Sequence, residues 1–448
     1  MTQFERKVSD FEDFKKFDIQ SRSFSRQFCG IYRARLATLK PNILKRVKSK
    51  DSKLKILQIV DLTNDEYLNT PCVIIGTLYK HQELKPSILK ELSEELQAVP
   101  QPPRLNYCSP KDTLFLEDNV SRVKLVGNIA LEILVSGLAC AVSGHGLNDG
   151  SFWVEDFYFP GPSLSPLTES PSSSAKDHGK LVLFLSGLDF VNQQNDLALE
   201  LLNDWITGLV GSEETQEESA GIVNVVIAGN SIRGSPETFT RKGYFENKKK
   251  DDLFALEVHR AVYKFDDFIS KISSSCKITL LPGEFDPSCH SLPQHPLHHN
   301  MLPKANRQGN TSGVTNPWIG KIGSRVVGGS SGQPILDIMK VTNTSESPLG
   351  WLEKTLEWQH FAPTAPDTLP EYPFDLSDPF VMSEYPNIYF AGNMEKYETK
   401  LLQGIHKMGD CEGQPIRLIC IPRFSTSQTA VLVDLESLEA KLVSFQSS

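Results

Sequence analysis

The chain has 448 residues, a hydrophobic content of 39% and a formal net charge of −9 at pH 7. This length exceeds one ordinary domain and predicts two or three, with enough apolar residues for sizeable cores. The acidic balance gives the whole molecule no strong attraction to phosphate backbones, which argues against tight duplex binding as its main task.

The spacing of the cysteines and the hydropathy of the chain limit the cellular compartments in which we expect the protein. The eight cysteines form no Cys-x-x-Cys pair, so zinc-ribbon and thioredoxin-like sites have no support. The polar start of the chain predicts no secretory signal, and no apolar run reaches the ~20 residues of a membrane span. We therefore expect reduced thiols, a location in the cytosol or nucleus, and no membrane partner.

Residues 1–50 are predicted to form a helical segment. Its aromatic residues recur at spacings typical of one helix face: Phe11, Phe14, Phe17, Phe24 and Phe28. We expect this stripe to pack on the next domain, with a partner-binding arm as the alternative. A basic run closes the segment at 45–50. We interpret it as a solvated helix end; a nuclear address or a nucleic-acid contact is the alternative.

Residues 51–165 have the pattern of a small barrel. A polar helix is predicted at 86–96, and strand-like runs bounded by turn residues occupy 54–60, 73–79, 122–126, 129–142 and 152–159. Several short strands with one helix favour a five-stranded barrel of the OB type. Such barrels bind single strands through aromatic and basic side chains. Here we expect the aromatic residues near Trp153 to fill the barrel or an interface instead.

A Pro/Ser-rich break at 160–179 predicts a linker or exposed loop. From residue 180 to 448, apolar runs alternate with helical patterns. Buried strands are predicted at 181–185, 222–228 and 277–281, and helices at 196–209 and 253–272. This alternation predicts an α/β domain whose sheet is covered on both faces, so that a site would lie in the loops after the strands.

These loops lack the residues that a two-metal phosphoesterase needs. Such an enzyme clamps phosphate with a bridging carboxylate and several His, Asn or Asp ligands. The corresponding positions are Ser186, Leu188, Asn230, Glu284, Asp286, Asn393 and Glu395. An amide such as Asn230 cannot supply the bridging negative charge. We therefore predict a degenerate site with no catalytic residue, no metal and no cofactor.

The remaining candidate sites have ordinary structural explanations. His360 is the one histidine that could survive as a metal ligand, and we expect a hydrogen-bonded structural role for it. The prolines around a second histidine cluster favour a packed loop over a metal site: His290, His295, His298 and His299. The run from Gly328 to Gln333 lacks the Gly-Lys-Ser/Thr ending of a phosphate loop and is expected to cap a helix near Pro334. Ser330 and Ser331 lack the elbow of a nucleophile.

Several longer motifs resemble the small (B) subunit family of DNA polymerase delta. The motif Leu281-Pro282-Gly283-Glu284-Phe285-Asp286-Pro287 is the clearest of them. The others lie at 24–32, 292–298, 315–317, 362–369, 372–374, 378–380 and 389–393. The barrel segment is also similar to that family, and the resemblance covers most of the chain.

The resemblance implies an OB-fold domain docked on a calcineurin-like phosphoesterase α/β domain that has lost its activity, whereas archaeal relatives keep a nuclease site. On that comparison, Ser186 to Leu188 replaces Asp-x-His and Asn230 replaces the Asp of Gly-Asp. Glu284 to Asp286 stands in place of Asn-His-Asp. Asn393 to Glu395 replaces His-x-His, and His360 keeps the lone His.

The resemblance further implies a scaffold role in the nucleus, in DNA replication and repair. Its partners would be the cysteine-rich C-terminal domain of the catalytic subunit and the third polymerase delta subunit, with indirect links to the sliding clamp and DNA. Three alternatives stay open. One is an active metal-dependent phosphoesterase or nuclease using Asp189, Glu284, Asp286 and His360. The others are a single-strand-binding barrel and the small subunit of polymerase alpha or epsilon.

Overall fold

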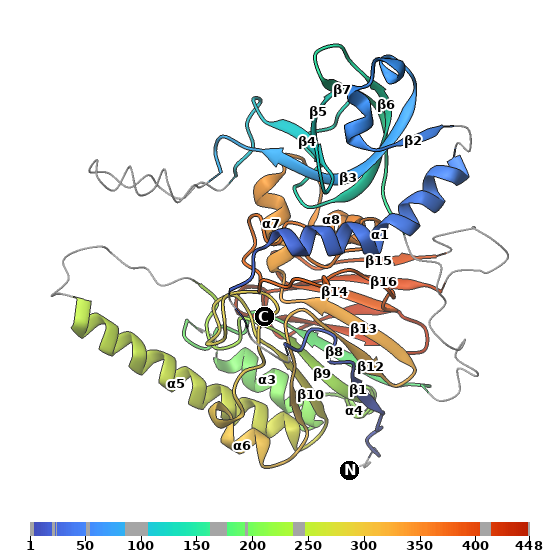
Figure 1. Ribbon diagram of the computed structural model, residues 1–448. Helices are drawn as coiled ribbons and strands as arrows, with labels where there is room; N and C mark the ends of the chain where they lie inside the picture. Colours follow the sequence, from blue (N-terminus) through green and yellow to red (C-terminus); the bar gives the residue numbers. More distant parts are fainter. Residues whose placement is uncertain are drawn as a thin grey trace. The chain divides into compact units, whose positions relative to one another are not determined.

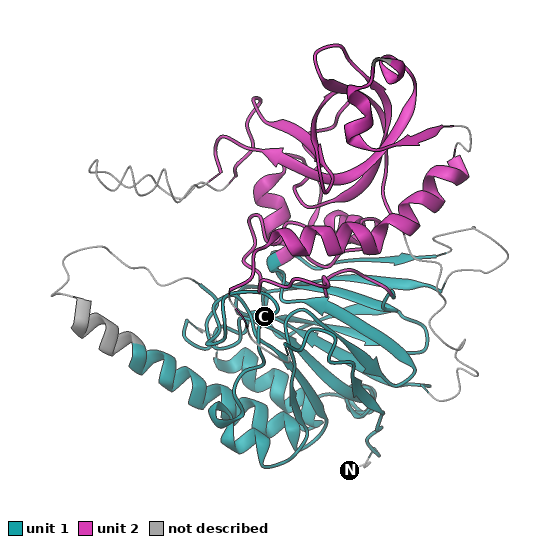
Figure 2. Ribbon diagram, viewed as in Figure 1, with its two compact units in different colours: residues 1–21, 164–333, 384–448 teal, residues 22–163, 334–383 magenta. Residues whose placement is uncertain are grey.

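The computed structural model describes residues 4–19, 23, 25–50, 54–85, 106–161, 177–192, 196–235, 247–403 and 414–446. The chain divides into two compact units (Figure 2). Unit 1 comprises Met1–Ser21, Leu164–Gln333 and Glu384–Ser448, and unit 2 comprises Arg22–Ser163 and Pro334–Ser383. The division therefore differs from the consecutive segments expected from the sequence, because residues 334–383 belong with the barrel.

Unit 2 contains a closed barrel (Figure 1). Its strands are β2 (Lys55–Leu57), β3 (Cys72–His81), β4 (Thr113–Glu117), β5 (Arg122–Gly127), β6 (Ala139–Gly146) and β7 (Ser151–Tyr158). The sheet order is β2-β3-β4-β5-β7-β6, and β3 also pairs with β6, so that five strands close a ring and β2 extends β3 in parallel. The expected barrel is present; the strand predicted at 129–142 begins only at Ala139, and the helix predicted at 86–96 lies outside the described residues.

In the described residues of unit 2, the barrel is accompanied by the helices α1 (Cys29–Lys50), α7 (Gln333–Val341) and α8 (Pro348–Glu357). Helix α1 buries one apolar face against the barrel. The contact joins Leu39, Ile43 and Val47 to Val73 and Ala141. The helical expectation is thus right for this part of residues 1–50, and α7 starts where the capping pattern predicted it.

The helical expectation is wrong for the first phenylalanines. Phe11 lies in strand β1 (Phe11–Asp13), which pairs antiparallel with β12 (Trp318–Ile322) of unit 1. Its ring stacks on Trp318 with centroids 6.1 Å apart. The spacing of three residues between these phenylalanines is also found on helix faces, but the pairing of β1 with a strand distant in the sequence determines the local conformation.

Unit 1 is built on two six-stranded sheets (Figure 1). One has the order β11-β10-β9-β8-β17-β18, with strands Thr311–Gly313, Lys277–Leu281, Ile222–Ala228, Leu181–Leu185, Thr429–Asp434 and Ala440–Ser444. The other has the order β1-β12-β13-β14-β16-β15, where β13 is Arg325–Ser330, β14 Ile388–Met394, β16 Ile416–Pro422 and β15 Glu398–Leu402. Strands β8, β9 and β10 occupy the residues predicted for buried strands, and they pair in parallel.

The core of unit 1 has two layers. Alternate residues of β8 point to opposite faces, as the pleat requires. Phe184 packs between the sheets against Phe390, with ring centroids 5.4 Å apart, and Leu183 and Leu185 belong to the layer under the helices. The helices of unit 1 are α3 (Asp196–Thr207), α4 (Glu213–Ala220), α5 (Asn247–Ser273), α6 (Pro303–Asn306) and α9 (Phe424–Ser427). None of the described helices is both long and apolar enough to cross a bilayer.

A buried ion pair ties together three segments of unit 2. Arg35 of α1 and Asp378 are both fully buried, and the arginine Nε–H donates to the carboxylate at 2.7 Å. Its remaining N–H groups donate to the carbonyl oxygens of Gly137, Pro363 and Ala365 at 2.8 to 3.0 Å. Burial alone would raise the pKa of Asp378, but the charge of Arg35 and the hydrogen bonds from His360 and Arg35 hold that pKa well below its usual range. The pair thus fastens α1 to both the barrel and the 358–383 segment.

Glu371 is the unusual member of this cluster. It is buried, and neither carboxylate oxygen has a hydrogen-bond partner among the described residues. Burial, and then the nearby Asp378 charge, raise the pKa of Glu371 despite the opposing effect of Arg35. A protonated Glu371 therefore suits the folded state better than a charged one.

Replacing Arg35 should destabilise unit 2 strongly. Arg35→Ala leaves the Asp378 carboxylate buried without its cation, for which we expect a loss of about 3–5 kcal/mol in the free energy of unfolding. Denaturant unfolding provides the measurement. The exposed Arg33→Ala on the same helix is the control and should stay within about 0.5 kcal/mol of the wild type. A loss below about 1 kcal/mol for Arg35→Ala would contradict the assigned role.

Replacing Glu371 should stabilise the protein increasingly as pH rises. Because the pKa of Glu371 is raised on folding, its stabilising contribution is full below the ordinary glutamate pKa and is lost as pH rises through the folded pKa. Glu371→Gln removes this loss, so the free energy of unfolding of the variant relative to the wild type should increase as pH rises from the ordinary glutamate pKa towards the folded pKa. The exposed Glu357→Gln carries the same charge change and should show no such trend. A constant difference across pH would refute the assignment.

Candidate functional site

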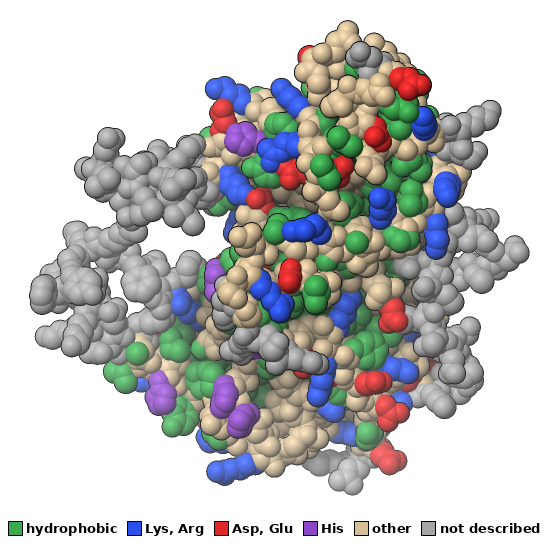
Figure 3. Space-filling view, in the orientation of Figure 1, with side chains coloured by type: hydrophobic (Ala, Val, Ile, Leu, Met, Phe, Trp, Pro, Cys, Tyr) green, Lys and Arg blue, Asp and Glu red, His purple; other side chains and the backbone are tan. Residues whose placement is uncertain are grey.

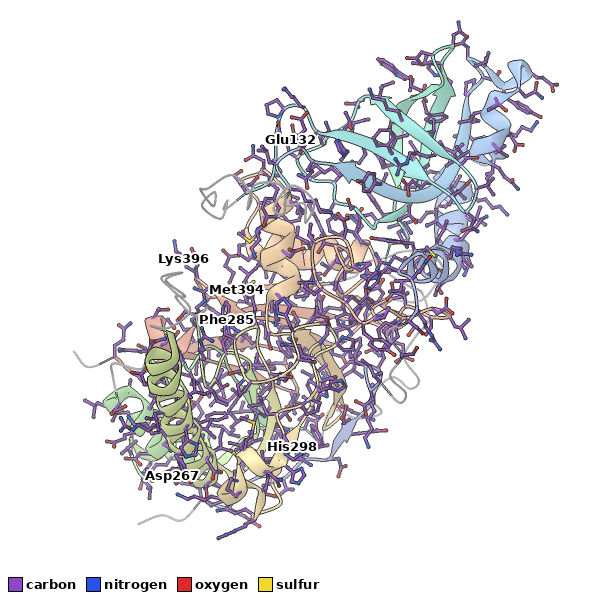
Figure 4. All side chains as sticks on the ribbon, turned by 60° about the vertical axis from the view of Figure 1, so that its left-hand side comes forward. Glu132, Asp267, Phe285, His298, Met394 and Lys396 are labelled. Atoms are coloured by element: carbon purple, nitrogen blue, oxygen red, sulfur yellow. The ribbon has the colours of Figure 1, made fainter. Side chains whose placement is uncertain are left out.

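Apart from His360, the predicted site residues lie where strands of unit 1 end. Parallel strands β8, β9 and β10 of one sheet and β13, β14 and β16 of the other all lead into loops that contact one another. The Gly187 N–H donates to the Gly229 carbonyl at 2.9 Å, and Ser331 Oγ donates to the Pro282 carbonyl at 2.7 Å. Phe285 and Met394, labelled in Figure 4, mark the loop after β10 and the end of β14. The expected convergence of the loops is therefore present.

The approach is so close that a side chain would not fit at some positions. A Cβ atom on Gly283 would lie 2.1 Å from the backbone nitrogen of Asn230, and one on Gly392 would lie 2.7 Å from the Ala228 carbonyl oxygen. Real Cβ atoms do not approach other atoms this closely, so only glycine lets the backbones meet. The glycines of the Pro-Gly-Glu and Gly-Asn motifs thus have a packing role.

Ser186 and Asn393 bond to each other's loops. Asn393 adopts a positive φ of 58°, and its backbone N–H donates to Ser186 Oγ at 2.9 Å. Ser186 Oγ in turn donates toward the carbonyls of Ile421 and Pro422 at 3.1 Å. The Asn393 amide nitrogen donates to the carbonyls of Ala228 and Ser331, both at 2.9 Å. Two neutral side chains therefore join the ends of five strands: β8, β9, β13, β14 and β16.

Asp286 caps the loop that follows β9. Its buried carboxylate accepts backbone N–H groups from Gly283 at 2.9 Å and from the loop after β9, where Ile232 is nearest at 2.8 Å. Burial raises the pKa of Asp286, and the hydrogen bonds from the backbone oppose that rise. Asn230, also at positive φ, accepts the Phe285 N–H through Oδ1 at 3.2 Å. Both side chains are committed to the backbone of this edge.

The other predicted positions do not join these contacts. Leu188 is fully buried in the core beneath the helices. Asp189 accepts hydrogen bonds from Asn192 at 3.1 and 3.2 Å, whereas Glu284 is half-buried and Glu395 is exposed. Over the described residues, no three His, Cys, Asp or Glu side chains are arranged to hold a metal ion.

His360 belongs to unit 2 and is part of the Arg35 cluster. Its Nε2 lies 2.9 Å from Asp378 Oδ2, and its Nδ1 accepts the Ala362 N–H at 3.1 Å. This assigns Nε2 as the protonated nitrogen and accounts for both nitrogens. The geometry agrees with the hydrogen-bonded role that we expected for this histidine.

The remaining candidates are dispersed or engaged locally. His298 and His299 stack with centroids 4.4 Å apart on the exposed surface, His290 is exposed and His295 is half-buried. The buried Ser330 accepts the Gly332 N–H through its hydroxyl oxygen at 3.3 Å. Ser331 donates to Pro282 as described above. Neither serine shows the hydrogen bond to a histidine that an activated nucleophile requires.

One polar cluster escaped the sequence analysis. Asn316 Nδ2 donates to Gln294 Oε1 at 2.7 Å and to Gln333 Oε1 at 2.9 Å. Gln294 Nε2 donates to the carbonyls of Gly283 and Cys289, at 3.0 and 2.8 Å. These buried amides brace the loop that carries Asp286. Gln294 and Asn316 lie in the motifs at 292–298 and 315–317 that resemble the family, and this resemblance was the sequence feature that could have drawn attention to them.

Comparison with known proteins gives a consistent result over both units. The family model for the DNA polymerase delta subunit OB-fold domain matches residues 27–157. The model for the B subunit of DNA polymerases alpha and epsilon matches residues 182–400. The first match supports the OB type for the barrel of unit 2.

Individual relatives match almost from end to end. DNA polymerase delta subunit 2 of Drosophila melanogaster is 35% identical over 435 residues, 96% of this chain and 95% of the relative. The DNA polymerase delta small subunits of Oryza sativa and Arabidopsis thaliana are each 36% identical, over 99% and 98% of this chain and 99% and 96% of their own lengths. The chain therefore belongs to the family of DNA polymerase delta small subunits.

Proposed function

We propose that the chain is a non-catalytic accessory subunit of replicative DNA polymerase delta in the nucleus. It acts as a scaffold in DNA replication and repair, and its unit 1 is a calcineurin-like phosphoesterase fold whose site has degenerated. The observation that carries the proposal is similarity to polymerase delta small subunits over nearly the full length of both proteins. The similarity spans both units, which supports one shared role for the whole chain.

The hydrogen bonds at the strand ends support a role without catalysis. A dinuclear site needs anionic and imidazole ligands that face the metals. Here Asn230 and Ser186 are neutral, and the buried Asp286 carboxylate accepts backbone N–H groups. The groups that would coordinate metals in an active relative instead hold loops together, which favours a rigid scaffold.

The scaffold would bridge two partners. One is the cysteine-rich C-terminal domain of the catalytic subunit, and the other is the third subunit, which connects the assembly to the sliding clamp. A folded scaffold with preset surfaces limits the conformational entropy lost on assembly. The braced loops of unit 1 and the buried ion pair of unit 2 suit that requirement.

Affinity purification tests the assembly role. We expect the tagged full-length chain, isolated from its own cells, to bring down the polymerase delta catalytic chain in near-stoichiometric amount by mass spectrometry. Exposed-surface variants serve as controls for expression. Recovery of the chain alone, or with the catalytic chain of polymerase alpha or epsilon, would refute the proposal.

Hydrolysis assays test the degenerate site. We expect the purified chain with added Mn²⁺ to hydrolyse bis(p-nitrophenyl) phosphate no faster than buffer. The Asp189→Ala/Glu284→Ala double variant is the matched control, because these two carboxylates are not committed to backbone N–H groups after β9. Manganese-dependent turnover that the double variant abolishes would establish an active phosphoesterase instead.

A further inference from the structure

Helix α1 presents a basic outer face. Its 22 residues include seven Lys or Arg and no Asp or Glu. Arg35 is the buried one. The outer face, here called the α1 stripe, consists of four exposed side chains: Arg33, Lys40, Lys45 and Lys48. Figure 3 shows Lys and Arg side chains spaced along this part of the surface.

Local structure does not explain the stripe. Lys48 is near the helix C-terminus, where a cation interacts favourably with the helix dipole, but Arg33 and Lys40 lie too far from that end. In the described part of the chain, Lys40, Lys45 and Lys48 form no ion pair with a carboxylate, whereas Lys50 pairs with Asp156 at 3.1 Å. In a molecule with a net charge of −9, this is a local concentration of unbalanced positive charge.

The spacing of the stripe suits a regular polyanion. Arg33, Lys40 and Lys48 follow one another at intervals of seven and eight residues, close to two helical turns, so they lie on one side of the helix. At about 1.5 Å per residue the stripe is about 22 Å long, which corresponds to about six base pairs of duplex. Apolar packing of Leu39, Ile43 and Val47 on the barrel holds the opposite face in place.

The composition of the stripe favours duplex over single-stranded nucleic acid. Proteins that hold single strands combine positive charge with exposed aromatic rings on which bases stack. The stripe itself contains no aromatic residue: it is formed by three lysines and one arginine on the outside of one helix. Contacts of this type neutralise phosphates and position a duplex without sequence preference.

We propose that the α1 stripe binds the sugar-phosphate backbone of double-stranded DNA without reading its sequence. The contact is weak and salt-sensitive, and it holds a duplex against unit 2. The inference goes beyond the accessory-subunit role and is independent of it, because it concerns the free chain and no polymerase partner is needed to test it.

Fluorescence anisotropy with a labelled random-sequence 20-base-pair duplex tests the proposal. We expect the full-length protein to bind with a dissociation constant of about 10⁻⁶ to 10⁻⁴ M at physiological salt, as non-specific binders do. Lys40→Gln/Lys45→Gln/Lys48→Gln should weaken binding at least tenfold and should reduce the slope of log K against log salt by about one per lysine removed. Circular dichroism and the unfolding midpoint should match the wild type, because all three side chains are exposed.

A matched triple variant separates the stripe from net charge. Lys271→Gln/Lys321→Gln/Lys396→Gln removes three exposed lysines from unit 1 and should change the affinity less than twofold. Any of three results would overturn the proposal. They are an equal loss of duplex affinity in both triple variants, no binding by the wild type below about 100 μM, and tighter binding to a single strand of the same length. If the stripe variant folds poorly, Lys40→Gln and Lys48→Gln are tested singly, and each should lower the salt slope by about one.

Discussion

Several buried polar side chains find their hydrogen-bond partners on segments far apart in the sequence, and these contacts organise both units. In unit 2 the guanidinium of Arg35 is satisfied by one carboxylate and three carbonyl oxygens from segments far apart in the sequence. In unit 1 the same requirement is met by Asn393, Ser186 and Asp286, each of which bonds to neighbouring loops. A buried group left without its partner costs several kcal/mol when charged, so these contacts select one arrangement of the loops.

At the strand ends of unit 1, neutral side chains join the converging loops. The loops that follow parallel strands meet at the same edge of the sheet, whatever residues those loops contain. Where charged ligands would repel one another without metals, amides and hydroxyls attract one another by donating and accepting hydrogen bonds. Asn393 and the buried Gln294–Asn316–Gln333 cluster use this property, and their hydrogen bonds join the loops of this edge.

The sequence predicted those parts of the fold that depend on local patterns. Strands β8, β9 and β10 were located because strands buried on both faces are continuously apolar, and the loops that converge follow from their order. Phe11 was misassigned because its partner, Trp318, is some 300 positions away. The hydrogen bonds of the site could not be predicted either. The Asp286 carboxylate accepts the N–H groups of Ser231 and Ile232, which are more than 50 residues away in the sequence. His360 could be judged structural, but its partner Asp378 could not be named from spacing.

The interleaving of the two units also dictates an order of events during synthesis. Arg35 leaves the ribosome 343 residues before Asp378, and nearly all of unit 1 up to Gln333 is made in between. Until Asp378 is synthesised, Arg35 lacks the carboxylate partner that it has in the folded chain. Unit 2 is therefore complete only after residues 334–383 have been translated. A product that terminates before Asp378 would lack the carboxylate that pairs with Arg35 of α1.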